Sequence, residues 1–402
     1  MPPIPRYRAQ ESQTLLATFL SAGFRPFFLS AGLWAAVGLP LSIAYVEMAA
    51  ELPTRFSPSI WHPHEMAFGF GGAVVAGFLL TAIPNWTGRM PLQGAPLAGL
   101  VALWFLGRIA VLVSANMPAP VAAAFDLAFP AVFFLVVARE IATGRNWRNL
   151  PMVVALALLF VGNLLTHLDV MNIAATGVLG AHIGVATLAM LVALVGGRIT
   201  PSFTRNWLVK TLPGAIEPAP FGALDRFALT ATLVTLIAWV AFPGATLTAF
   251  LQIIAGAALF LRLTRWRGAR TGAEPLLFVL HLGYGWLALG LILMGANQLL
   301  GFTDPTAPLH ALTAGAIGTM TLAVMTRATR GHTGRALVAD RGTVAIYVAI
   351  TLSAALRVAA PFTGEYYFAA LAVAAGLWSL AYGLFVLLYF GMLTGPRVQA
   401  NA

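Results

Sequence analysis

Cysteine is absent from the 402-residue chain, which excludes disulfides, iron–sulfur clusters and thiolate metal sites. Any bound metal must therefore be held by His, Met, Asp, Glu or backbone oxygen. The sequence also lacks a catalytic triad, a P-loop, a dinucleotide fingerprint and the HExxH and CxxCH motifs. Nucleotide-driven transport and covalently attached haem thus have no support in this sequence.

Charged residues are scarce, at 9% against about 25% in ordinary soluble proteins, whereas 59% of the residues are hydrophobic and the mean hydropathy is +0.85. Such a chain cannot cover its surface with polar groups, so the lipid bilayer is its expected solvent. A net charge of +10 would suggest nucleic acid in a soluble protein. Here the cations lie in short segments between apolar runs, so we expect no nucleic-acid partner and predict an all-α polytopic membrane protein.

Twelve apolar runs account for most of the chain, and most are long enough to cross a hydrocarbon layer of ~30 Å. The run at 119–141 is interrupted by Asp126 and Pro130. The runs cover residues 24–45, 64–86, 95–115, 119–141, 150–168, 174–197, 223–242, 246–265, 274–297, 306–328, 342–360 and 366–394.

The basic residues predict the orientation of these spans. The N-terminal segment 1–13 and most other Lys and Arg fall on one side, which the positive-inside rule assigns to the cytoplasm, so both termini are expected there. The opposite loops carry acidic residues instead. We expect one integral-membrane domain over 1–402, with halves 1–197 and 223–402 joined by a cytoplasmic loop at 198–222.

Ionisable groups inside a membrane are costly, and they are functional candidates for that reason. Five of the seven histidines are predicted to lie in the outer half of the bilayer: His62, His64, His167, His182 and His310. Histidines that snorkel to water would explain one or two of them, but five at similar depth favour a metal or haem site.

Small residues accompany two of these histidine segments. They form rows at helical spacing, which are His310, Ala314 and Gly318 in one span and Glu65, Gly69, Ala73 and Gly77 in another. A flat macrocycle such as haem needs space beside a helix, which a row of small residues provides. The alternative explanation is ordinary small-residue packing between membrane helices.

A second polar group is predicted toward the cytoplasm. His281 and His332 lie there with Arg198 and Arg327, and the two arginines could hold an anionic group such as a haem propionate or a lipid headgroup. The alternative is simple positive-inside charge. Arg108 and Asp126 lie at similar depth in neighbouring spans and are expected to form a buried ion pair, with a proton path as the other possibility.

Several segments resemble the NnrS family. They are Gly23 to Phe28, Trp61 to Phe70, Ala76 to Gly88, Gly196 to Thr204, Met325 to Arg327 and Gly331 to Gly334, so the resemblance covers almost the whole chain. It implies a haem- and copper-containing protein of the bacterial inner membrane that is linked to nitric oxide metabolism and to tolerance of nitrosative stress.

The NnrS family is also considered distantly similar to the twelve-helix subunit of haem-copper oxidases and nitric oxide reductases, whose bundle this chain is then expected to resemble. In that subunit, histidines on helices 2, 6, 7 and 10 carry the metals. Here the seventh span, 223–242, has no histidine, and the tenth has one before its terminal loop rather than a close pair. The oxidase ligand set is therefore not reproduced.

The leading hypothesis is a redox protein that binds nitric oxide. If it is an enzyme, it would reduce nitric oxide with electrons from membrane quinol. A b-type haem would take axial ligands from His62 or His64 and from His310, and copper would use His167, His182 or the remaining histidine, with Met66 as a soft ligand for Cu(I). One alternative is a metal or small-ion transporter or trafficking protein that uses the same histidines. The other is a structural or assembly protein.

Overall fold

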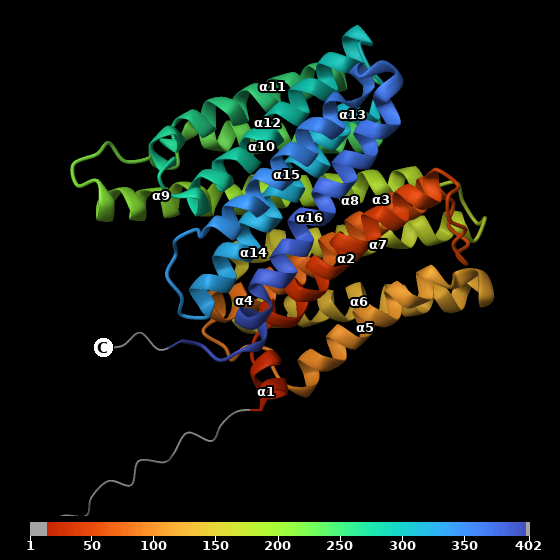
Figure 1. Cartoon of the computed structure of the whole chain (residues 1–402), viewed down its shortest axis with the longest axis horizontal. Helices are drawn as coiled ribbons and strands as arrows, with labels where there is room; N and C mark the ends of the chain where they lie inside the picture. The colour runs from red at the N-terminus through yellow and green to blue at the C-terminus, as the bar shows by residue number, and fades with distance from the viewer. Residues whose placement is uncertain (1–13, 399–402) are drawn as a thin grey trace, which may run out of the picture.

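The computed structural model describes residues 14–398, so the basic segment 1–13 lies outside the described part. Within it, twelve helices are long and apolar enough to cross a membrane, and no strand occurs among residues 14–398. The predicted all-α polytopic fold is confirmed. The even number of spans returns the chain to the side where it starts, and Figure 1 shows α1 (Leu15–Phe19) near the end of the last helix.

The observed helices follow the predicted runs closely. Nine of the spans are mainly single helices, which are α2 (Phe24–Val46), α5 (Ala95–Leu112), α6 (Ala119–Thr143), α7 (Leu150–Val170), α10 (Ala223–Ala241), α11 (Thr246–Thr264), α12 (Pro275–Leu300), α15 (Arg341–Ala359) and α16 (Tyr367–Thr394).

The other three spans each contain a π-helical segment, in which the helix widens by one residue. The second span consists of α3 (Pro58–His64), η1 (Glu65–Gly71) and α4 (Gly72–Thr87), the sixth of α8 (Gly177–Leu191), η4 (Val192–Gly196) and α9 (Gly197–Thr211), and the tenth of α13 (Thr306–His310), η6 (Ala311–Gly318) and α14 (Thr319–His332). These segments thus recur at every fourth span. Two of them begin directly after a histidine, which directs attention to His64 and His310.

The prediction of a loop at 198–222 is wrong for the first half of this segment, because α9 remains helical to Thr211. Pro201 lies inside this helix and has no N–H to offer the carbonyl of Gly197 one turn earlier. Arg262 donates to that carbonyl instead, with its Nη2 3.2 Å from the Gly197 oxygen. The helix therefore tolerates the proline, and its end projects from the bundle in Figure 1.

Packing brings the π-containing spans together. Most neighbours along the chain pack in pairs, such as α11 with α12 and α15 with α16, and α2 closes the bundle against α16. The sixth span is central, since α8 contacts both η1 and η6. The second and tenth spans are the most deeply buried in the protein. The second and tenth spans therefore lie in the interior of the bundle, each in contact with the sixth.

The contact between α11 and α12 supplies a test of the packing. A Cβ added at Gly256 would lie 2.6 Å from the carbonyl oxygen of Ala288, so Gly256→Val forces the two helices apart. We expect a loss of about 1–3 kcal/mol, seen as a lower melting temperature in detergent. Gly376→Val is the matched control, since nothing lies within 4 Å of its added Cβ. Equal melting temperatures for the two variants would contradict this packing.

Candidate metal centre

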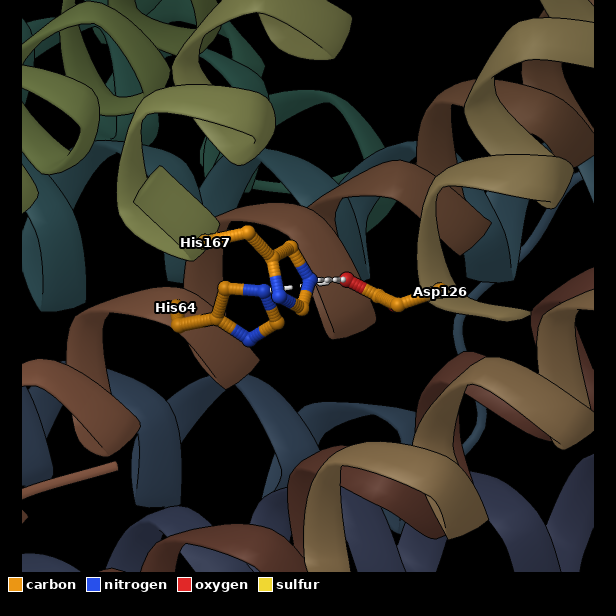
Figure 2. Close-up of side chains that lie close together, drawn as sticks. All are labelled: His64, Asp126 and His167. Carbon is orange, nitrogen blue, oxygen red and sulfur yellow. Dashed lines mark hydrogen bonds and ion pairs between the residues drawn. The ribbon is translucent and has the colours of Figure 1, made fainter. Parts of the chain in front are cut away.

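Two imidazoles and one carboxylate from three spans converge in the protein interior. They are His64 at the end of α3, Asp126 on α6 and His167 on α7 (Figure 2). Nε2 of His64 lies 3.1 Å from Oδ2 of Asp126, and Nε2 of His167 lies 2.9 Å from the same oxygen. One ligand atom from each residue lies within 4.8 Å of the other two, which is a spacing that a single metal ion could span.

The cluster is closed off from its surroundings. His64, Asp126 and His167 each have 1% of their surface exposed. Phe56 covers them from the loop before α3, with its ring centroid 4.9 Å from that of His64 and 5.4 Å from that of His167. Phe56 is itself buried, so water reaches these three side chains poorly and their charges act at low local dielectric.

Three further polar side chains surround the cluster. Glu65 Oε1 lies 2.9 Å from Nδ1 of His64, and Arg108 donates to both Glu65 and Asp126. Asn163 donates to Oδ2 of Asp126 at 2.9 Å, while its own Oδ1 lies 2.8 Å from Nε2 of His64. These contacts fix the orientation of the imidazole and the carboxylate.

The formal charges of this network do not cancel. Glu65 and Asp126 carry two negative charges, and Arg108 supplies one positive charge. Oδ2 of Asp126 already accepts three contacts, while Oε2 of Glu65 is buried without a partner. One negative charge is left inside the membrane, and burying it uncompensated is costly. Either a protonated imidazole or a bound cation must balance it.

His62 and His310 form a second pair beside this network. Their rings are nearly parallel, at 18°, with centroids 6.3 Å apart. Nδ1 of His310 lies 2.6 Å from the carbonyl oxygen of Thr306 and donates to it, which leaves Nε2 as the free acceptor. This tautomer is the usual one for a metal-ligating histidine. Because His62 and His64 are two residues apart on one helix, they point in different directions.

The model of the NnrS protein family matches residues 18–397. The chain belongs to the NnrS family. This membership links it to nitric oxide metabolism in general terms. A comparison with curated proteins gives no significant match.

Other ligands expected for this NnrS-family protein lie apart from the buried cluster. The ring of His182 stacks on Trp239 of α10, with centroids 4.3 Å apart. Met66 extends toward α2, where its Cε would lie 3.3 Å from a Cβ at Gly38. His281 faces α9, with Nε2 2.9 Å from the hydroxyl of Thr204. The structure therefore brings His64 and His167 together but joins neither His182 nor Met66 to them.

The small-residue rows are filled by side chains of the chain itself. A Cβ at Gly77 would lie 2.6 Å from the ring of Phe28, and one at Gly318 would lie 2.6 Å from the ring of Trp378. At Gly69 the nearest atom is Nη1 of Arg108, at 2.8 Å. These glycines provide room for aromatic rings and the arginine, so in this structure they do not line a slot for a macrocycle.

The second predicted polar group assembles around a cavity of about 560 Å³. Arg198, Arg327 and His332 line it together, and Arg148 joins them, whereas His281 does not. The cavity lies where α9, α14 and the end of α4 meet, on the side predicted to face the cytoplasm. It is thus separate from the histidine cluster, which lies at the predicted outer ends of the spans.

Sequence reasoning found Arg108 and Asp126, which the structure places in a direct ion pair, but it did not assign Glu65 and Asn163 to the same network. A usable signal was present for Asn163, since it precedes His167 by four residues and so shares its helix face. Glu65 adjoins His64 at the first residue of η1, where it pairs with Arg108.

Arg108→Met should destabilise the protein strongly, because it leaves both Glu65 and Asp126 without their guanidinium. The expected loss is about 3–5 kcal/mol, measured by thermal unfolding in detergent. Arg139→Met removes an exposed arginine as the control and should have little effect. Adding Glu65→Gln to Arg108→Met should restore part of the stability. If Arg108→Met and Arg139→Met unfold alike, the charge balance described here is wrong.

Proposed function

We propose that this protein is a membrane metalloprotein of nitric oxide metabolism that holds a transition-metal ion between His64, Asp126 and His167. The observation that carries the proposal is that two buried imidazoles converge on one carboxylate oxygen, in a network whose two carboxylates exceed its single guanidinium. A metal cation supplies the missing positive charge and uses the donors at hand. A protonated histidine would balance the charge as well, so the metal has to be tested directly.

Copper is the metal this donor set favours in our proposal. Imidazole nitrogen suits copper, and among divalent first-row ions copper binds such sites most strongly. The surrounding contacts are those expected around a metal site, since Glu65 orients His64 and Asn163 orients Asp126. A copper ion would supply one-electron chemistry and a coordination position for nitric oxide. The chain's own part is to exclude water and hold the ligands in place.

Haem, the second cofactor expected of the family, does not fit at the predicted outer ligands in this structure. The glycine rows beside His64 and His310 are filled by Phe28, Trp378 and Arg108. The rings of His62 and His310 lie 6.3 Å apart between centroids, and neither residue lines the cavity of about 560 Å³. We therefore derive no step from haem at this position.

If the protein is an enzyme, membrane quinol is the electron donor that we propose for nitric oxide reduction. Two molecules of nitric oxide, two electrons and two protons would give nitrous oxide and water, with the quinol oxidised to quinone. Both reactants dissolve in lipid, which surrounds the spans. Glu65 and Arg108 are the ionisable groups beside the proposed metal ligands, and they would be the first candidates for holding a proton there.

The metal content of purified variants tests the proposed centre. We expect about one copper ion per chain in the copper-loaded protein, lost in His64→Ala and His167→Ala, because each removes one of only two imidazole ligands. His182→Ala is the matched control, since that ring stacks on Trp239. Copper retained in both cluster variants, or lost equally in His182→Ala, would refute the assignment.

The reaction with nitric oxide provides an independent test. Nitric oxide added anaerobically to the copper-loaded, reduced protein should change its optical or electron paramagnetic resonance spectrum, and the change should be absent in His167→Ala. Vesicles that contain the protein and reduced quinol should consume nitric oxide if the site is catalytic. A colourless protein that instead accumulates metal inside vesicles would support transport, and our proposal would fail.

A further inference from the structure

We propose that the arginine-lined cavity is a binding site for an amphiphilic anion, meaning a molecule with an anionic head and an apolar body. The site is distinct from the proposed metal centre and is formed by other elements. Arg148 comes from the start of the fifth span, Arg198 from α9, and Arg327 and His332 from the last turns of α14. Residues from six of the twelve spans thus contribute to one cavity.

The three arginines have no anionic partner in the described part of the chain. None of Arg148, Arg198 and Arg327 takes part in an ion pair among residues 14–398, and no Asp or Glu is among the described lining residues. Glu274 acts electrostatically on Arg327, but its carboxylate accepts the N–H of Leu276 and lies outside the lining. The guanidinium groups therefore repel one another and have donors available for an anion.

Most of the remaining lining is apolar, and it includes four aromatic rings. Phe28 comes from α2, Phe78 and Trp86 come from α4, and Phe203 and Met152 complete the walls. The guanidinium carbon of Arg327 lies over the ring of Phe203, 4.3 Å from its centroid. This contact holds the Arg327 guanidinium against Phe203 at the wall of the cavity, so cationic and apolar groups line the same site.

Size and position favour an organic anion over a small inorganic ion as the occupant. A volume of about 560 Å³ lies in the range of sites that enclose whole organic ligands, roughly 300–1,000 Å³. The cavity also lies on the predicted cytoplasmic side, where basic pockets between membrane helices meet anionic headgroups. Two ligands share the required chemistry, which are an anionic phospholipid and a haem whose propionates face the arginines. Neither source rests on the proposed copper centre.

Arg198→Gln combined with Arg327→Gln tests the site. Native mass spectrometry of the detergent-solubilised protein with added phosphatidylglycerol or phosphatidylcholine measures the lipid source, and the haem content of the purified protein measures the haem source. If lipid is the occupant, the preference for phosphatidylglycerol should fall about tenfold in the double variant, because two charge-assisted contacts are lost. If haem is the occupant, the haem-to-protein ratio should fall instead.

Two further variants complete the design. Arg226→Gln removes an exposed arginine at the start of α10, outside the cavity, and should match the wild type in both measurements. Ala82→Phe narrows the cavity without changing its charge and should weaken the same ligand that the double variant loses. If the arginine double variant equals Arg226→Gln in lipid preference and haem content, the proposal is overturned.

The result can be separated from that for the metal centre. Copper content should be unchanged in the arginine double variant, because His64, Asp126 and His167 are not in the cavity. Failure of the copper proposal would leave the lipid preference to be measured on its own. A loss of both copper and ligand in the double variant, with an unchanged melting temperature, would contradict two independent sites.

Discussion

One guanidinium shared by two buried carboxylates is the interaction on which the centre of this protein depends. Arg108 bonds to Glu65 on η1 and to Asp126 on α6, so it ties the second, third and fourth spans together in the buried interior. The pairing leaves a single negative charge, which the neighbouring imidazoles of His64 and His167 are placed to balance, either by a proton or by a metal that they bind. The same two carboxylates thus hold the spans together and provide the negative charge on which the proposed metal site depends.

The π-helical segments explain how spans distant in sequence deliver their side chains to one place. Each adds a residue to its helix, and they recur in spans two, six and ten, with α8 of the sixth span in contact with both η1 and η6. Such a segment costs regular hydrogen bonding and is typical of functional positions. Here it begins directly after His64 and after His310, so the histidines end regular turns and the following residues are turned toward neighbouring helices.

The polar groups of the molecule are divided between two ends. At the predicted outer side, His64 and Asp126 belong to a network in which two carboxylates share one guanidinium, whereas arginines without an anionic partner in the described residues line the cavity at the predicted cytoplasmic side. This division argues against treating all the histidines and arginines as one cofactor site. In our two proposals, a cation would bind at the first place and an anionic amphiphile at the second.

The sequence by itself determined the family, the twelve spans and their approximate limits. The spans can be found in this way because the length of a continuous apolar run reflects the thickness of the bilayer and does not depend on which helices are in contact. It also supplied the pairing of Arg108 with Asp126, since two opposite charges in adjacent spans have few other partners. Tertiary structure alone decided which histidines meet. His182 faces Trp239 while His64 meets His167, and Glu65 joins them through a π-helical turn. Side-chain direction on a helix changes by about 100° per residue. A shift of one residue, as a π-helical segment introduces, therefore changes which side chains face the site, and a hydropathy pattern does not reveal such a shift.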